Sequence, residues 1–194
     1  MPETRTTATG SELFIVDNSD VDWKVVRYLH DWADISTSFD VATGCFEIGS
    51  LLALEGQWQK LEKIRILMGA ETTQRTRQAL LEALRNTVTS QLDSSIEKAK
   101  DQNDFLAGVP AIADALRARQ IECRVYTKKK FHAKAYITHA KLAVVGSAAL
   151  VGSSNFTQPG LEDNVELNIQ VRREVEVLQQ WFDRAKDVVG NVCS

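Results

Sequence analysis

The sequence predicts a single α/β domain, with a mixed central β-sheet flanked by helices and one copy of the fold per chain. Its 194 residues are 44% hydrophobic and 25% charged, which suits one globular unit with a substantial core. Apolar strand-like runs alternate with amphipathic helical stretches, and no low-complexity linker divides the chain. We therefore expect residues 1–12 to form a flexible tail and residues 13–194 to form the domain.

Local patterns predict the elements of the first part of the chain. Apolar side chains at helical spacing follow Asp, Asn and Ser, which favour helix N-caps, and a Ser-, Thr- and Val-rich strand then ends near Gly44. Later, Pro110 fits the first turn of a helix or a local kink. In order, we expect a helix at 17–33, a strand at 34–46, a helix at 47–63, a strand at 64–69 and helices at 72–101 and 104–120.

The pattern changes to β-structure after residue 120. The stretches IECRVYT, KFHAKAYIT, KLAVVGSAALVGSS and NVELNIQV are apolar and rich in β-branched or aromatic residues, and an amphipathic stretch follows them. These stretches predict strands at 121–127, 130–138, 141–154 and 164–171, and a final helix at 173–189.

Composition argues against several classes of protein. No run of about 18 uncharged apolar residues occurs, and the N-terminal stretch MPETRTTATG lacks the pattern of a secretion signal, so we expect a cytoplasmic protein without a membrane span. Cys45, Cys123 and Cys193 are odd in number and lack CxxC spacing, which argues against a disulfide framework and a zinc site. We expect neither a metal nor another cofactor.

The stretch FHAKAYI places a histidine and a lysine two residues apart. Because successive side chains of a strand alternate between its faces, His132, Lys134 and Tyr136 should share one side. An imidazole that attacks phosphorus or carries a proton, beside an ammonium that holds an anionic oxygen, suits phosphoryl chemistry. Taken alone, an HxK pair is also compatible with ordinary solvated polarity.

A second motif, VGSSN, follows an apolar run. Ser153 and Asn155 lie where a turn exposes backbone N–H groups and small polar side chains, which bind phosphate oxygens well, although a plain connecting turn has the same composition. Glu166 lies eleven residues after Asn155 in the sequence, between two apolar neighbours. If it points inward it needs a partner, and a histidine Nδ1–H would serve; otherwise it is an outward-facing acid.

Together, HAK, GSSN and the later glutamate resemble the signature of the phospholipase D superfamily. The closest similarity is to single-motif members: small bacterial nucleases, metal-independent restriction endonucleases and phospholipase D-like domains at the N-termini of helicase-related proteins. The resemblance implies that His132 is the nucleophile that forms a phosphohistidine. It also implies that Lys134 and Asn155 bind the non-bridging phosphate oxygens, that Ser153 assists them and that Glu166 orients the histidine.

The same resemblance implies a second histidine as general acid, and hence a partner subunit. The chain has one HxK, and its other histidines, His30 and His139, are poor candidates, the latter because its strand parity is opposite to that of His132. A twofold homodimer would bring two copies of the motif into one cleft. The chain departs from the family pattern at His139, where HKD-type members carry an aspartate.

Basic residues near the motifs predict a polyanionic substrate, DNA or RNA. Lysines that each neutralise one phosphate give sequence-independent affinity, although a solvated turn is the alternative. The predicted nucleic-acid contacts are Lys128, Lys129, Lys130 and Lys141. Together with the resemblance, which implies metal-independent chemistry and a place within a larger helicase or restriction protein, this charge predicts a phosphodiesterase or nuclease domain that acts on nucleic acid. The alternatives are a catalytically silent DNA-binding or dimerisation module and, less favoured, a phospholipid hydrolase.

Overall fold

A computed structural model describes residues 14–70, 104–187 and 190–191. The expected tail at 1–12 and the expected helix at 72–101 lie outside these residues. The strands are β1 (Ile15–Val16), β2 (Ser36–Thr43), β3 (Lys63–Met68), β4 (Ile121–Val125), β5 (Ala135–Ala140), β6 (Ala148–Gly152), β7 (Asn168–Val171) and β8 (Gly190–Asn191). They form one sheet in the order β1-β7-β6-β5-β2-β3-β4-β8. Pairing is parallel from β2 through β3 to β4 and antiparallel elsewhere, so the predicted mixed sheet is confirmed.

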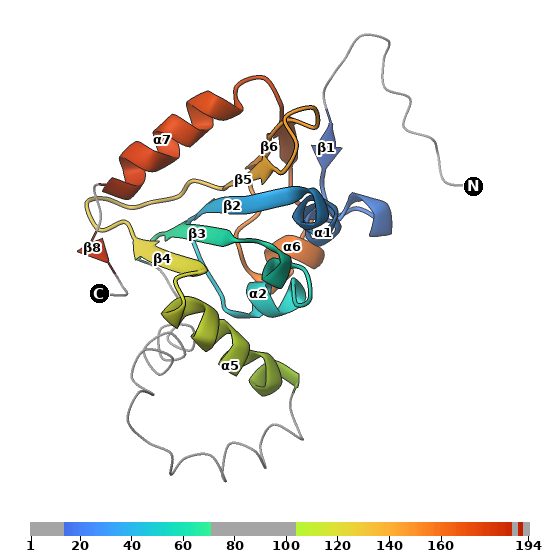
Figure 1. The fold of residues 1–194 in the computed structure, drawn as a ribbon. Coiled ribbons are helices and arrows are strands. Elements are labelled where there is room, and N and C mark those ends of the chain that lie inside the picture. Colours follow the sequence, from blue (N-terminus) through green and yellow to red (C-terminus); the bar gives the residue numbers. More distant parts are fainter. Residues whose placement is uncertain (1–13, 71–103, 188–189, 192–194) are drawn as a thin grey trace, which may run out of the picture.

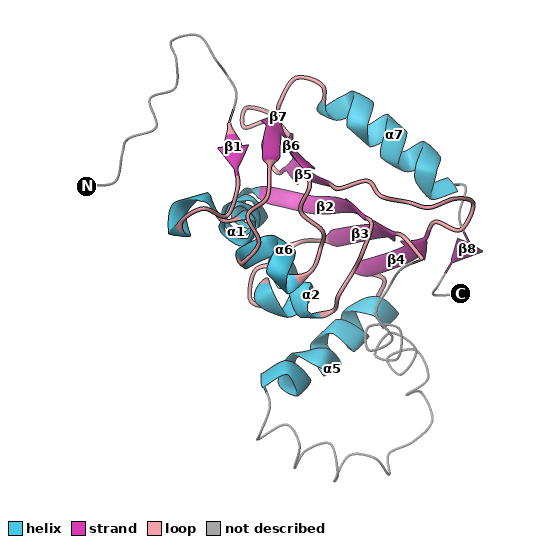
Figure 2. Ribbon diagram, turned by 180° about the vertical axis from the view of Figure 1, so that it is seen from behind, coloured by secondary structure: helices cyan, strands magenta, loops and turns pink. Residues whose placement is uncertain are grey.

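Helices cover both faces of the sheet (Figure 1). The helices are α1 (Val25–Ile35), α2 (Gly49–Ala53), α5 (Asp104–Arg117), α6 (Gln158–Glu162) and α7 (Val175–Asp187). The first four share one side of the sheet, and α7 is the helix among the described residues that packs on the other side, as the view from behind also shows (Figure 2). Two separate apolar cores result, and Tyr136 and Phe182 are among the largest fully buried side chains.

Several expected elements are shorter in the structure than the sequence pattern predicted. The expected helix at 47–63 divides into α2 and a 3₁₀ turn (Trp58–Lys60), because Gly56 adopts a left-handed backbone with φ of 79° between them. The expected helix at 17–33 likewise divides into a 3₁₀ turn (Val21–Trp23) and α1, whose first N–H, that of Val25, is bonded to the Asn18 side chain. Pro110 lies inside α5 rather than in its first turn.

The strands bring both sequence motifs to one end of the sheet. The strands β2, β3, β4 and β6 end there, whereas β5 and β7 begin there, as their parallel and antiparallel registers require. We call this the motif end of the sheet. Residues 141–147, which were expected to belong to a strand, form a turn at the opposite end, with Gly146 at a φ of 69°.

Candidate active site

His132 and Lys134 lie at the motif end, just before β5 begins at Ala135. The HAK motif therefore lies in the loop that directly precedes β5, whereas the sequence pattern predicted that it lies within a strand. The Lys134 Nζ lies 2.8 Å from His132 Nδ1, so the two side chains share one side as predicted. The Tyr136 hydroxyl continues the alternation on that side and donates to the Ser154 carbonyl at 3.0 Å.

The histidine and the lysine differ in exposure. His132 is exposed to solvent, whereas only 8% of Lys134 is exposed. Burial lowers the pKa of the Lys134 amine, and the negative charge of Glu166 partly opposes that shift. A poorly hydrated ammonium beside an accessible imidazole can bind an anionic oxygen strongly, because little water competes for it.

Asn155 presents its amide nitrogen at the same place. Its Oδ1 accepts a hydrogen bond of 3.1 Å from the Cys45 backbone N–H, which fixes the orientation of the amide. A Cβ placed on Gly44 would lie 3.3 Å from Asn155 Oδ1 and 3.4 Å from His132 Cα, so both motif residues flank this glycine. Among the described residues Nδ2 has no hydrogen-bond acceptor, and it can donate to a ligand.

Thr43, the last residue of β2, holds this arrangement together. Its hydroxyl donates to the Cys45 carbonyl at 2.6 Å and accepts from the Phe156 backbone N–H at 2.9 Å. The Phe46 and Phe156 rings stack beside it at 5.6 Å. The sequence analysis missed Thr43, although the TGCF stretch around Gly44 was a usable signal, because a glycine at a strand end permits the close backbone approach seen here.

Ser153 and Glu166 form a pair of their own. The Ser153 hydroxyl donates to Glu166 Oε2 and accepts from the Leu167 backbone N–H at 3.0 Å. Glu166 lies in the loop before β7, which begins at Asn168, and its neighbours Val165 and Leu167 are exposed by 84% and 58%. In the part of the chain that the structure describes, no hydrogen bond joins Glu166 to His132. The expected contact between Glu166 and Nδ1 of His132 is thus not present within one chain. The Lys134 Nζ lies next to that nitrogen instead.

Asn168 fixes the loop that carries the GSSN motif. This side chain is fully buried, and its Nδ2 donates to Ser154 Oγ at 2.9 Å and to the Val16 carbonyl at 3.0 Å, while its Oδ1 accepts from the Ser154 N–H. Gly152 permits the contact, since a Cβ there would lie 2.0 Å from the Leu167 carbonyl oxygen. Asn168 is therefore a positioning residue that the sequence analysis did not single out.

The four predicted basic contacts do not lie together. Lys128, Lys129 and Lys130 are exposed on the loop that leads from β4 to His132. Lys141 instead follows β5 at the opposite end of the sheet, where its Nζ donates to the Asp34 carbonyl at 3.0 Å. A six-residue strand is about 17 Å long, so Lys141 is remote from His132.

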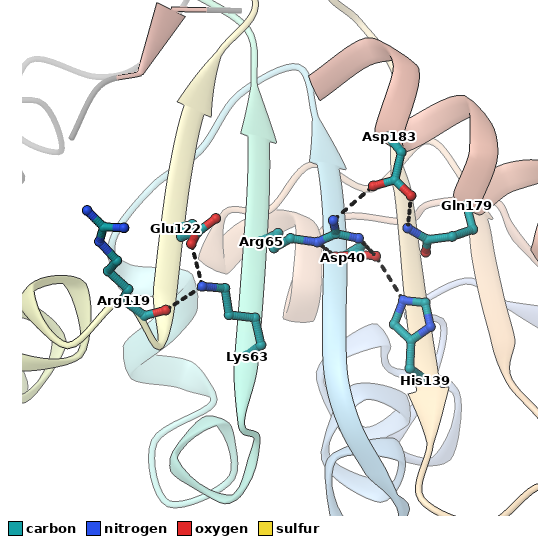
Figure 3. A network of polar contacts seen from close by, with 8 residues as sticks. All are labelled: Asp40, Lys63, Arg65, Arg119, Glu122, His139, Gln179 and Asp183. Carbon is teal, nitrogen blue, oxygen red and sulfur yellow. Dashed lines mark hydrogen bonds and ion pairs between the residues drawn. The ribbon is translucent and has the colours of Figure 1, made fainter. Parts of the chain in front are cut away.

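His139 belongs to a separate polar network on the α7 side of the sheet (Figure 3). Its Nε2 lies 2.8 Å from Oδ2 of the buried Asp40, which also receives two hydrogen bonds from Arg65. A third Arg65 nitrogen donates to Asp183 on α7 at 2.8 Å. His139 therefore faces away from His132, as its strand parity predicted, and the network links the sheet to α7 through Arg65 and Asp183.

We expect Asp40→Ala to lower the free energy of unfolding by about 3 kcal/mol, because it leaves Arg65 without its main buried partner. Burial raises the pKa of Asp40, but hydrogen bonds from His139 and Arg65 outweigh it, so the net shift is downward. The stabilisation is thus present above the unfolded-state pKa and decreases as pH falls through the folded-state pKa.

Denaturant unfolding at neutral pH and at acid pH measures this effect. Asp34→Ala is the matched control, because Asp34 pairs with Lys60 on the surface, and we expect no measurable change from it. Equal stabilities of Asp40→Ala and Asp34→Ala would contradict the structural role assigned to the network.

A comparison with known protein families matches the part of the chain that carries the motif residues. The family model described as "Cardiolipin synthase, PLD-like domain" matches residues 53–186. The chain belongs to the phospholipase D superfamily. The search of curated proteins gave no match. The superfamily assignment confirms the resemblance inferred from HAK and GSSN, and the matched span includes His132, Lys134, Asn155 and Glu166.

Solved structures of several bacterial proteins share the fold. Nuc from Salmonella typhimurium, a phospholipase D family member, is 13% identical with a TM-score of 0.55, covering 94% of this chain and 98% of that one. NucT from Helicobacter pylori is 11% identical with a TM-score of 0.52, over 92% and 96%. Phosphatidylserine synthase from Haemophilus influenzae Rd KW20 is 7% identical with a TM-score of 0.54, over 93% and 39%.

Two further features of the described residues concern ligands and membranes. Within them, no group of three or more His, Cys, Asp or Glu side chains has an arrangement that could hold a metal ion. No helix in the same residues has both the length and the apolar character needed to cross a membrane.

Proposed function

We propose that this phospholipase D domain is a metal-independent phosphodiesterase that cleaves DNA or RNA through a phosphohistidine intermediate. The observation that carries the proposal is the convergence at Gly44 of an exposed imidazole, a buried ammonium and an amide nitrogen that has no acceptor among the described residues. These belong to His132, Lys134 and Asn155. Fixed donors of this kind stabilise the charge that develops on phosphoryl oxygens.

The chemistry consists of two displacements at phosphorus. The Nε2 of His132 attacks the phosphorus, a P–N bond forms, and the P–O bond to the leaving oxygen breaks while that oxygen takes a proton. Water then attacks the phosphohistidine, the P–N bond breaks, and the water proton passes to a base. The Lys134 ammonium moves from Nδ1 to a phosphate oxygen when substrate binds, and Asn155 Nδ2 donates to another oxygen.

Glu166 acts in this scheme through its neighbours. Its carboxylate accepts the Ser153 hydroxyl hydrogen bond and favours the charged form of Lys134. The proposed role is therefore to hold Ser153 and the ammonium in place at the motif end. Once Lys134 has moved, the ring proton of His132 lies on Nδ1, and Glu166 accepts a hydrogen bond from that N–H, which leaves Nε2 free to attack phosphorus. This revises the simple glutamate–histidine pair that the motif spacing suggested.

A homodimer supplies the general acid in this proposal. The sequence contains three histidines, of which His30 lies on α1 and His139 lies on the α7 side of the sheet. The second copy of His132 must then protonate the leaving oxygen. Val165 and Leu167 support a contact at the motif end, because both are exposed apolar side chains that flank Glu166.

Nucleic acid is the proposed substrate because Lys128, Lys129 and Lys130 form an exposed basic loop next to His132. The motif resemblance further supports a role within a helicase or restriction system.

Cleavage assays in excess EDTA test the proposal. Single-stranded and duplex oligonucleotides, a small phosphodiester ester and phosphatidylcholine vesicles are incubated in parallel with the dimeric protein. We expect the ester and the oligonucleotides to be cleaved and the vesicles to be left intact. Oligonucleotide binding without any cleavage would support the silent module instead, and vesicle turnover alone would support lipid hydrolysis.

A further inference from the structure

The strands β2 and β3 are each followed by a glycine next to the loop that carries His132. The parallel register pairs Thr43 with Met68, the last residues of the two strands. Gly44 and Gly69 follow them, so the two glycines lie side by side at the motif end. Both are buried, and the Gly69 N–H donates to the Thr43 carbonyl at 3.0 Å. We call Gly44 and Gly69 the glycine platform.

The glycine platform leaves almost no space for a side chain. A Cβ placed on Gly69 would lie 2.4 Å from the Gly44 carbonyl oxygen and 2.9 Å from the Phe131 carbonyl oxygen. A Cβ placed on Gly44 would lie 3.4 Å from the same Phe131 oxygen and 3.4 Å from His132 Cα. Neither glycine has a positive φ. What glycine permits at these positions is therefore the close approach of another main chain.

The main chain around His132 has few other constraints. In the described part of the chain, no backbone-to-backbone hydrogen bond is made by Phe131, His132 or Ala133. The hydrogen bond that the His132 carbonyl accepts from Lys134 Nζ stays within the same motif. The strands β2 and β3, in contrast, each pair with a neighbouring strand on both sides. Contact with the glycine platform therefore sets how closely the His132 main chain approaches the strand ends.

A methyl group at Gly69 would force a movement of main chain. Cβ atoms essentially never lie within 3.0 Å of a non-bonded atom, so the 2.4 Å separation from the Gly44 oxygen has to grow by at least 0.6 Å. No flexible side-chain end can yield here, because the nearest atoms are backbone carbonyl oxygens. Movement of Phe131 shifts His132, which follows it. Movement of Gly44 shifts the main chain that flanks both His132 and Asn155.

We propose that the glycine platform positions the nucleophile: Gly44 and Gly69 hold the His132 main chain at the distance that in-line attack on phosphorus requires. The proposal rests on the proposed function, because it assigns further residues to the same reaction. The two donors assigned to phosphate binding, Lys134 Nζ and Asn155 Nδ2, tolerate a small shift better than the nucleophile does, since attack needs alignment as well as contact. The platform therefore acts on the chemical step more than on binding.

The test compares Gly69→Ala with the original protein in the hydrolysis of a small phosphodiester ester in excess EDTA. We expect kcat to fall about 10²-fold, while KM and the inhibition constant of inorganic phosphate change by less than about threefold. Gly44→Ala requires its neighbours to move by only a few tenths of an ångström, and it should lower kcat about 10-fold. The second variant provides the comparison if Gly69→Ala does not fold.

Gly108→Ala is the matched control for a glycine in tight packing elsewhere. The atoms nearest to a Cβ at this position belong to Leu52 and Glu55, and none belongs to a residue assigned to the site. Whatever the effect of this substitution on the Tm, kcat of the folded protein should stay within about twofold. An unchanged kcat in both platform variants, or an equal loss of kcat and of phosphate affinity, would overturn the proposal.

NMR spectra of the imidazole groups give a readout that needs no turnover. The chain has three histidines, and the His132 signals are assigned by their loss in His132→Ala. We expect Gly69→Ala to shift the His132 signals and to leave those of His139 in place. In Gly108→Ala the His132 signals should stay where they are in the original protein. Unshifted His132 signals in Gly69→Ala would contradict the positioning role.

Failure of the glycine platform and failure of the proposed function give different results. If the original protein cleaves the ester and Gly69→Ala cleaves it equally fast, only the positioning role is wrong. If the original protein cleaves no phosphodiester, the phosphodiesterase proposal fails, and the imidazole signals still decide whether the platform fixes the position of His132.

Discussion

His132→Ala should lower kcat for a small phosphodiester ester by about 10⁴-fold or more, measured in excess EDTA. The imidazole is the only described group at the motif end that we assign as nucleophile, and alanine offers no atom to form the P–N bond. Lys134 and Asn155 remain, so substrate binding should change far less than turnover. Trapping with acid should show phosphohistidine in the original protein and none in the variant.

The loss must come from chemistry rather than from unfolding. His132 is exposed, so its removal creates no cavity and the Tm should be unchanged. His30→Ala is the matched control: it removes another histidine, whose Nε2 lies 3.1 Å from the Ala53 carbonyl on a helix away from the site, and activity should stay within about twofold. Activity retained by His132→Ala would refute the assigned nucleophile.

The same variant tests the shared cleft. If one active site needs His132 from both subunits, a dimer that combines one original and one His132→Ala subunit is inactive. Equal amounts of the two chains, mixed to random dimers, should then give about one quarter of the activity of the original protein at the same total concentration. About one half would show that each subunit works alone.

The sequence predicted the parts of the site that depend on local spacing. The alternation of side chains along a strand placed Lys134 with His132 and His139 on the other face, and both placements are found in the structure. The partner of His139 was beyond reach, because Asp40 is 99 residues away in the chain. Such contacts depend on strand order, which the local pattern does not specify.

Two wrong placements and one missed residue have the same cause: local sequence patterns do not specify where a strand begins and ends or which distant residues it contacts. Glu166 was expected within a strand because its neighbours are apolar, but β7 begins at Asn168, whose buried side-chain hydrogen bonds hold it in place, and Glu166 lies in the preceding loop. Lys141 was grouped with the basic residues by its closeness in sequence, although β5 carries it to the other end of the sheet. Thr43 was missed because its bond to Phe156 spans 113 residues.

Lys134→Met should lower kcat/KM for a phosphodiester about 10³-fold, because it removes the buried charge to which we assign the binding of the phosphoryl oxygens. Methionine keeps the length and apolar stem of the side chain, so packing against neighbouring residues should persist. Steady-state assays with a small ester avoid any contribution from the basic loop. Lys60→Met is the control, since this exposed lysine pairs with Asp34 away from the site and its loss should leave kcat/KM unchanged.

The pH dependence of kcat/KM identifies the same ammonium. Burial lowers the pKa of Lys134, so the amine loses its proton at a lower pH than an ordinary lysine does. Only the charged form binds the phosphate oxygens, and activity should therefore fall as pH rises through this lowered pKa. In Lys134→Arg the guanidinium stays charged throughout this range, so the alkaline decrease should move to higher pH whatever the absolute rate. An alkaline decrease at the same pH in both proteins would assign the titration to another group and leave Lys134 without its proposed role.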